Sequence, residues 1–451
     1  ALRALAERQE REGDVYGRLD SCRRLVVADP HSSVYAIGLM HALDAAGDWI
    51  GAIQHAAEHA QRRRADLELG PDPEVEALAE RLRTAPPKRR STTNATSREA
   101  SVSIAVLPFR NLSTDPENAC FADGITEDVI ANLSKIRALR VISRASMMHF
   151  REERPAVQEI GTTVGASVVL TGSVRRSGDR VRIVAQLTDA ETDRHLWSET
   201  YDRRMEDIFT IQSEVALQIA SALETELSPA EHTRVRRKPT HDLQAYQLFL
   251  QGRQLLGRYT TDAMVGSLAF FSRAIARDPD FALAHAMLAT VHAQLAEMGV
   301  FDPASAYARA SEAVEQALRI DPDLDTAHCA LGFLKAVREY DWVGAEREFE
   351  RALELNPSSA DTYDLFGRVC AGIAKYDRAI ALLERASDLD PLAHRVDITT
   401  TLLRAGRVDE AIERAESALE IEAHERTRAT LGWAYFLKGR HAEGLAELER
   451  A

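Results

Sequence analysis

The stretch that decides the fold is YDLFGRVCAGIAKYDRAIALLERASDLDP, residues 363–391. Its large apolar residues and alanines recur at intervals of three and four, the spacing of one face of an α-helix. The stretch is long enough for two such helices, and Pro391 ends the second because proline cannot continue the backbone hydrogen-bond ladder. It therefore predicts an antiparallel helix pair.

The same pattern repeats through the C-terminal half of the chain. Pro322, Pro357 and Pro391 each follow an Asp or Asn, at spacings of 35 and 34 residues, and Asp278-Pro279 marks an earlier, looser unit. A period near 34 residues with two helices per unit is typical of a helix-hairpin solenoid. We predict about six units in residues 241–451, the last of them cut short where the chain stops.

These units resemble tetratricopeptide (TPR) repeats. The unit ending at Pro357 matches the TPR consensus after one inserted residue. In the unit ending at Pro391, the consensus positions for small and large residues are filled by Tyr363, Phe366, Gly367, Ala379, Leu383 and Ala386. Small residues let two helices approach, and large ones fill the space between them. The resemblance implies a solenoid with a concave groove that captures peptides.

Residues on the inner helices of such a solenoid face the groove, so we expect the protein-binding site there. The candidates are Phe333, Asp364, Arg368, Trp433 and Phe436. Their aromatic members could equally pack between neighbouring repeats, and the sequence leaves both roles open. Because the repeat region is acidic, a basic or apolar peptide is favoured over DNA as its ligand.

Residues 101–227 have a different period. Gly178-Asp179 predicts a hairpin turn, because both residues tolerate positive φ. The order of elements is βαβα, then a β meander and a last helix, which predicts an α/β domain. Short apolar or alternating runs predict strands at 103–109, 140–143, 167–175, 180–187 and 195–201, and amphipathic patterns predict helices at 123–136, 157–164 and 207–223.

Three stretches of this segment resemble the TolB-amino-terminal-like domain of bacterial signalling proteins. They are IAVLPFRNLSTDPEN (104–118), FADGITEDVIANL (121–133) and the long run at 170–203. In that family the domain lies between an effector domain and TPR repeats. The effectors include winged-helix DNA-binding domains, class III adenylate cyclases and serine/threonine kinases. The resemblance implies no catalytic chemistry for these residues.

Residues 1–84 are predicted to be a helical, TPR-like domain, and residues 85–100 a flexible linker that has almost no large apolar side chain. The first segment resembles the bacterial transcriptional activator domain of SARP-type regulators. Residues 4–13, the turn at Gly47-Asp48 and LELGPDPEVEALAERL (67–82) carry the likeness. In that family a winged-helix DNA-binding domain comes first. Because both ends of this chain fall inside helical patterns, we expect that domain to be missing here.

The composition excludes several classes of protein. The chain has 451 residues, 45% of them hydrophobic, a net charge of −14 and four scattered cysteines. It shows neither a membrane-spanning apolar run nor a disulfide or paired-cysteine pattern. Phosphate-binding, zinc and hydrolase motifs are missing as well. His55 and His59 are spaced to face one metal, but no third ligand is evident, which favours two exposed histidines. We expect no enzyme and no cofactor.

The sequence thus predicts a multidomain, mainly α chain with a helical N-terminal domain, a central α/β domain and a TPR solenoid. We expect the regulatory region of a cytoplasmic bacterial transcriptional regulator. Its groove would bind a protein partner, RNA polymerase would be a further partner, and DNA would be bound by the missing domain. The alternatives are the sensor half of an adenylate cyclase or serine/threonine kinase, or a non-catalytic TPR scaffold.

Overall fold

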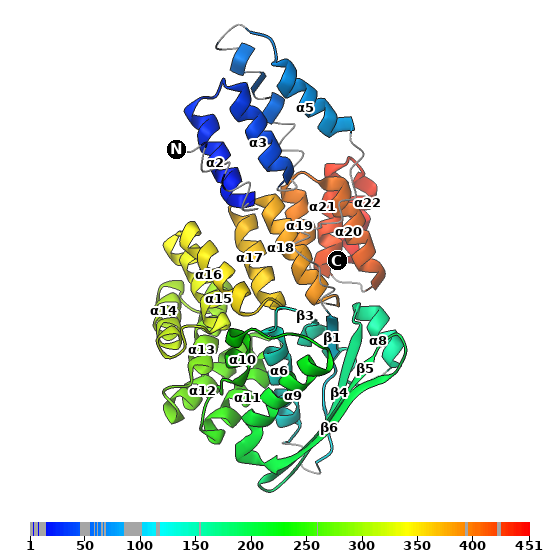
Figure 1. The fold of residues 1–451 in the computed structure, drawn as a ribbon, viewed down its shortest axis with the longest axis vertical. Helices are drawn as coiled ribbons and strands as arrows, with labels where there is room; N and C mark the ends of the chain where they lie inside the picture. The colour runs from blue at the N-terminus through cyan, green and yellow to red at the C-terminus, as the bar shows by residue number, and fades with distance from the viewer. Residues whose placement is uncertain are drawn as a thin grey trace. The chain divides into compact units, whose positions relative to one another are not determined.

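The computed structural model describes residues 15–45, 69–84, 102–113, 118–152, 155–258, 260–392, 396–421 and 425–451, with residues 3 and 8 and parts of 55–66. The chain divides into two compact units, Ala1–Arg98 and Glu99–Ala451 (Figure 1). The predicted linker at 85–100 and the predicted turn at Gly47-Asp48 lie outside the described residues.

The first unit is helical, as predicted. Its named helices are α2 (Val15–Ala28), α3 (Ser33–Ala45) and α5 (Pro73–Thr84). Their apolar faces meet in a small core that includes Cys22, Met40 and Leu78. The expectation of two exposed histidines is wrong, because His55 is 8% and His59 only 1% exposed. The His59 ring lies 3.3 Å from the His31 carbonyl oxygen, which gives this buried ring a polar partner.

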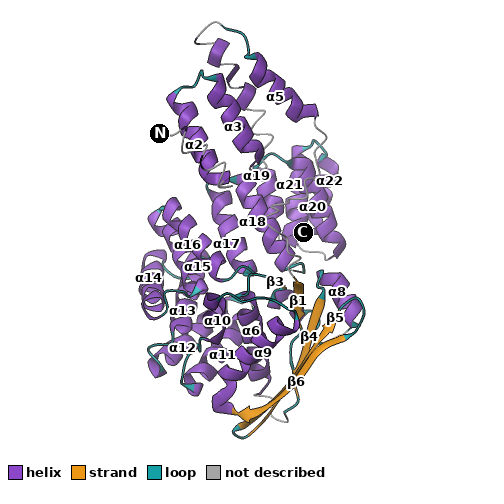
Figure 2. Cartoon of the chain, in the orientation of Figure 1, coloured by secondary structure: helices purple, strands orange, loops and turns teal. Residues whose placement is uncertain are grey.

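The second unit begins with a six-stranded mixed sheet of order β3-β1-β4-β5-β6, in which β2 pairs with β4 (Figure 2). The β1, β2, β3 and β4 pairings are parallel, and β4–β5–β6 is antiparallel. Gly178 has φ +60° in the β4–β5 turn, which confirms the predicted hairpin. The strands are β1 (Val102–Val106), β2 (Arg110–Asn111), β3 (Leu139–Val141), β4 (Val168–Ser177), β5 (Arg180–Asp189) and β6 (His195–Arg204).

Helices accompany this sheet on both faces. The predicted helices are present at nearly the predicted bounds, and α7 and α10 are additional. The helices of this segment are α6 (Asn118–Ser134), α7 (Arg144–Met148), α8 (Val157–Val164), α9 (Ile208–Ala222) and α10 (Pro229–Arg236), with the short helix η1 (Met205–Asp207) after β6. Residues of α7 and α8 share one core cluster with Ala105 and Val169, while α6 and α9 belong to another.

Helix hairpins form the rest of the unit, and they pair as α11–α12 through α21–α22. The Asp or Asn before each predicted proline directly follows a second helix, as at Asp321 after α14. The helices are α11 (Leu243–Leu256), α12 (Thr261–Arg277), α13 (Ala282–Glu297), α14 (Pro303–Ile320), α15 (Asp325–Leu334), η2 (Lys335–Glu339), α16 (Trp342–Leu355), α17 (Ala360–Gly372), α18 (Tyr376–Leu389), α19 (Val396–Arg404), α20 (Val408–Ile421), α21 (Glu425–Leu437) and α22 (His441–Arg450). The predicted mainly helical fold with a central α/β segment is confirmed.

One hydrophobic core continues from the sheet into the first repeats. It joins Ile104 of β1 and Leu170 of β4 to Phe249, Phe271 and Phe281 of the solenoid. The Phe249 ring centroid lies 5.6 Å from that of Phe271 and 5.0 Å from that of Phe281. These fully buried rings belong to the α/β core as much as to the repeats.

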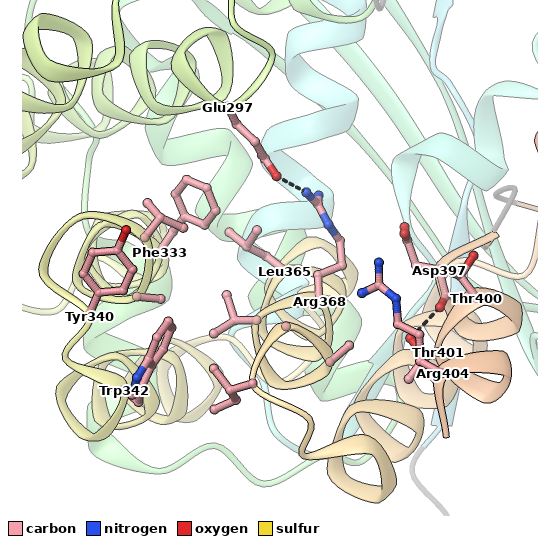
Figure 3. A pocket seen from close by; sticks show the side chains of 16 residues that line it. Glu297, Phe333, Tyr340, Trp342, Leu365, Arg368, Asp397, Thr400, Thr401 and Arg404 are labelled. Carbon is pink, nitrogen blue, oxygen red and sulfur yellow. Dashed lines mark hydrogen bonds and ion pairs between the residues drawn. The ribbon is translucent and has the colours of Figure 1, made fainter. Parts of the chain in front are cut away.

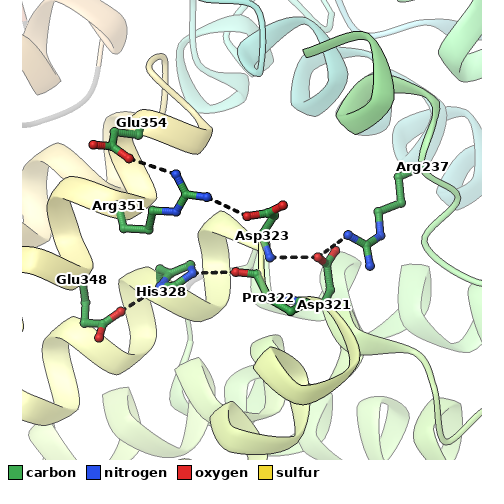
Figure 4. Close-up of polar contacts among 8 residues, drawn as sticks. All are labelled: Arg237, Asp321, Pro322, Asp323, His328, Glu348, Arg351 and Glu354. Atoms are coloured by element: carbon green, nitrogen blue, oxygen red, sulfur yellow. Dashed lines mark hydrogen bonds and ion pairs between the residues drawn. The ribbon is translucent and has the colours of Figure 1, made fainter. Parts of the chain in front are cut away.

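The turns that follow the second helices also contact the α/β segment and the chain that leaves it. Thr240 donates a hydrogen bond to Asp278 in the first turn. Arg237 Nη1 lies 2.5 Å from Asp321 Oδ1 in the second turn, where Asp321 also accepts from the Asp323 N–H (Figure 4). This ion pair and these hydrogen bonds fix the first two turns.

The third and fourth turns reach the edge of the sheet and helix α7. Ser358 Oγ donates to the Leu139 carbonyl oxygen at 3.1 Å and accepts from the Val141 N–H at 3.2 Å. Because β3 is an edge strand, this hydroxyl satisfies backbone groups that the sheet leaves unpaired. In the fourth turn, Asp390 Oδ1 accepts from the Ser146 N–H at 3.1 Å.

Candidate functional site

A cavity of about 530 Å³ opens on the inner helices of the solenoid. Its walls come from α13, α15 with η2, the start of α16, α17 and α19, which belong to repeats two to five. Figure 3 shows Phe333, Tyr340 and Trp342 on one side and Arg368 and Arg404 on the other. An enclosure that combines apolar walls with a few charged groups is the usual form of a ligand site.

Two of the five predicted groove residues line this cavity. Phe333 of α15 is only 5% exposed, so its ring packs in the repeat core while one side meets the cavity. Arg368 of α17 lines the opposite wall, and its Nη2 lies 2.5 Å from Glu297 Oε1 of α13. Phe333 therefore has both of the roles expected for the aromatic residues: it packs between repeats and it faces the groove.

The other three predicted residues lie outside this cavity. Asp364 is on α17 but is not among the lining residues. Trp433 and Phe436 lie together on α21, in the last repeat, with ring centroids 6.1 Å apart. Trp433 is 61% exposed, so it presents a separate aromatic surface. Binding at these three positions stays a prediction.

Tyr340 and Trp342 were missed by sequence reasoning, and their position depends on the one inserted residue. The insertion converts the end of the inner helix into a π-helical turn, η2, in which the Tyr340 N–H donates to the Lys335 carbonyl oxygen. The Asp341 N–H donates to the same oxygen at 3.0 Å. Such turns absorb an extra residue in a helix and are frequent at functional sites. Tyr340 follows in the left-handed conformation, with φ 55°. Its ring, 70% exposed, stands 5.9 Å from that of Trp342.

A second cavity, of about 630 Å³, lies where the α/β segment meets the first repeats. Asp128 of α6 lines it and lies beside Arg253, Gln212 and Tyr246. Arg253 Nη1 is 3.0 Å from Asp128 Oδ1, Gln212 Nε2 is 2.9 Å from Asp128 Oδ2, and the Tyr246 hydroxyl donates to the same oxygen. Burial raises the pKa of Asp128 to about 6 and lowers that of Arg253 to about 10. The arrangement links α6 and α9 to α11.

The described residues offer no ready metal centre. Among them, no three His, Cys, Asp or Glu side chains come together in a way that could hold an ion. Nor does any described helix have the length and apolar character needed to cross a lipid bilayer. The free cysteines are dispersed, and burial raises the pKa of Cys120 and Cys370 to about 11, which disfavours their reactive thiolate forms.

Comparison with known proteins finds a family model that matches the α/β segment. Residues 100–218 match the family model of the HilA/YgeH-like transcriptional regulator, second domain. The Rhizobium meliloti (strain 1021) protein "Putative adenylate cyclase 3" is 42% identical over 192 residues, 43% of this chain and 33% of that protein. The transcriptional regulator HilA of Salmonella typhimurium is 23% identical over 159 residues, 35% of this chain and 29% of HilA. The chain thus spans about a third of these relatives' length.

Solved structures with helical repeats give weaker similarities. The type IV pilus biogenesis factor PilW is 17% identical, with a TM-score of 0.38 over 46% of this chain and 91% of PilW. YrrB, described as a TPR protein with an unusual peptide-binding site, is 22% identical, with a TM-score of 0.30 over 40% of this chain and 89% of YrrB. The evidence for the solenoid is therefore the series of helix hairpins in this chain.

Proposed function

We propose that residues 1–451 form the regulatory and protein-interaction region of a cytoplasmic bacterial transcriptional regulator. The similarity of residues 100–218 to the second domain of HilA/YgeH-like regulators supports the regulatory part. The observation that carries the interaction part is the groove cavity, where exposed aromatic rings stand opposite two arginines. Exposed apolar groups beside charged ones are typical of a surface that binds a partner.

In this proposal, DNA is bound by a winged-helix domain outside residues 1–451. Residues 1–84 contact RNA polymerase. The net charge of −14 supports this division, because acidic surfaces repel the phosphate backbone. We assign residues 1–451 no catalytic step and no cofactor. In a fluorescence anisotropy titration with duplex DNA at physiological salt, this chain should show no sequence-dependent binding. Sub-micromolar, sequence-dependent binding would contradict the proposal.

A second candidate function is the sensor region of an adenylate cyclase. The 42% identity over 192 residues to the Rhizobium meliloti relative favours it. The coding frame upstream of Ala1 distinguishes the two candidates. A winged helix with a basic recognition helix supports the transcriptional regulator, whereas a class III cyclase domain supports the sensor. A serine/threonine kinase effector and a scaffold without an effector are the remaining alternatives.

Peptide capture in the groove is tested by selecting a phage-displayed random peptide library on this chain. We expect selected peptides to lose binding to Leu365→Glu, because Leu365 lines the cavity on α17. The matched control is Leu445→Glu, a change at an exposed leucine of α22 outside the cavity. A library that yields no binder, or binders that ignore Leu365→Glu, would contradict a peptide-binding groove.

A further inference from the structure

The groove cavity has a different charge balance from the whole chain, because equal numbers of acidic and basic side chains line it. Four charged side chains line it, namely Glu297, Arg368, Asp397 and Arg404. Glu297 is paired with Arg368, and Asp397 Oδ1 lies 4.0 Å from Arg426. Both lining carboxylates therefore have a cationic neighbour, although the chain as a whole is strongly acidic.

Arg404 is the exception among these groups. It lies at the end of α19, its side chain is exposed, and it has neither an ion-pair partner nor a side-chain hydrogen bond among the described residues. In Figure 3 Arg404 and Arg368 lie on the same side of the cavity, and Asp397 lies beside Arg404. A guanidinium without a partner has five N–H donors that match a carboxylate.

The opposite wall is apolar and aromatic. Val337 of η2 is half-buried there, and Leu365 and Val369, on the same helix α17 as Arg368, add half-buried apolar surface to the cavity. The Tyr340 and Trp342 rings extend this wall toward solvent in an edge-to-face arrangement of 75°. Burial of these apolar groups away from water is favourable in free energy. They therefore favour an apolar or aromatic ligand side chain next to the position where Arg404 would hold a carboxylate.

We propose that this cavity binds an acidic peptide segment, in which a carboxylate contacts Arg404 and Arg368 and a neighbouring aromatic or branched aliphatic side chain lies against Tyr340, Trp342 and Leu365. The inference rests on the proposed peptide-binding function and specifies its ligand. It departs from the expectation drawn from total charge, which favours a basic or apolar peptide. The difference arises because the Glu297 carboxylate is paired with Arg368 within the solenoid, whereas Arg404 has no ion-pair partner among the described residues.

The test uses two fluorescein-labelled peptides, Gly-Ser-Asp-Phe-Glu-Leu-Ser-Gly and the matched Gly-Ser-Lys-Phe-Lys-Leu-Ser-Gly, titrated with the full chain by fluorescence anisotropy. We expect the acidic peptide to bind more tightly, and its binding to weaken as salt screens the contact. Arg404→Gln should weaken it about tenfold, the scale of one lost charge-assisted hydrogen bond. Glu297→Gln should strengthen it several-fold, because it frees Arg368 for the ligand.

Arg385→Gln is the matched control, since Arg385 is an arginine of α18 outside the cavity. Thermal unfolding followed by circular dichroism checks that each variant folds. If the basic peptide binds more tightly in a Leu365→Glu-sensitive manner, or if Arg404→Gln behaves like Arg385→Gln, the acidic-ligand inference is overturned while the groove function stands. If neither peptide binds and the library yields no groove-dependent binder, the proposed function itself fails.

Discussion

Asp128 shows at the scale of one residue how the α/β segment is linked to the solenoid. Its carboxylate lies on α6, with 13% of the side chain exposed, and contacts Arg253 and Tyr246 of α11. Gly124, one turn earlier on α6, permits this approach, because a Cβ there would lie 2.6 Å from Leu250 Cδ1. Hydrogen bonding and close packing therefore hold the same helix pair together.

The first prediction concerns the pH dependence of stability. Burial raises the pKa of Asp128 to about 6 from the ordinary 3.8, so the folded state keeps this proton more firmly than the unfolded state does. The contribution of Asp128 to stability should therefore fall as pH rises through this window and stay constant above about 6. Relative to wild type, Asp128→Asn should gain up to about 3 kcal/mol between about pH 4 and pH 7, at about 1.4 kcal/mol per pKa unit.

Urea unfolding followed by circular dichroism, at a series of pH values, measures this difference. Asp377→Asn is the control, because the Asp377 carboxylate on α18 is largely exposed. A stability difference between Asp128→Asn and wild type that is independent of pH would show that Asp128 titrates normally.

At the residue scale, the sequence predicted only part of the site. Phe333 and Arg368 were found because the repeat period places them on inner helices that face the groove. Tyr340 and Trp342 were not found, since the consensus has no position for a residue that follows an insertion. The Arg253–Asp128 pair joins residues 125 positions apart along the chain, and no local pattern reports such a contact.

At the scale of elements, the π-helical turn η2 is the feature that distinguishes repeat three. The other inner helices run to their turns without such a segment in the described residues, whereas here the extra residue is absorbed between Lys335 and Glu339. Tyr340 adopts φ 55° at the turn that follows, as Ala374 does (φ 60°) after α17, and this conformation is unfavourable for a residue with a side chain. The repeat thus bears local strain where its aromatic wall begins.

The second prediction follows from that strain. Tyr340→Gly should stabilise the chain by about 1 kcal/mol, because glycine adopts positive φ without steric cost and the exposed ring contributes little burial. The same change should lower the affinity for the acidic peptide, since it removes one aromatic ring from the cavity wall. Chemical denaturation and peptide titration measure the two effects. Lower stability together with unchanged affinity would contradict this account of the turn.

Elements were more predictable than the contacts between them. The strands and helices of residues 101–227 were predicted to within a few residues, because their apolar periods are regular and Gly178 marks the hairpin. The Asp-Pro and Asn-Pro pairs located the ends of the second helices. Two short helices, α7 and α10, carried too little periodicity to be found. The buried His59 was misjudged, because its partner is a backbone carbonyl, which no side-chain pattern reveals.

At the scale of the whole second unit, the α/β segment and the first repeats depend on each other. Their common core extends from Ile104 to Leu295, and four successive turns contact the α/β segment or the chain that leaves it. Stability in most solenoids is a sum over neighbouring repeats. Here the first repeats have a second neighbour, the sheet with its helices.

The third prediction is that residues 99–227 do not fold alone. Such a fragment would expose the apolar surface that Phe249, Phe271 and Phe281 cover, and should give a broad, non-cooperative thermal transition. Residues 99–300, which retain α11 to α13, should unfold cooperatively. Circular dichroism and calorimetry of both fragments provide the measurement. A cooperative transition for 99–227 would show that the shared core is not essential.

The row of turn contacts also has an evolutionary consequence. Solenoids commonly gain or lose repeats by duplication and deletion, because each unit touches only the next one. A unit added among the first four would shift the turn residues by one repeat from their partners. The pairs that would be separated are Asp321 with Arg237, Ser358 with the β3 edge, and Asp390 with Ser146. Changes in repeat number should therefore be confined to the part after Asp390, and descendants of this gene should differ in length there while their first four repeats keep their count.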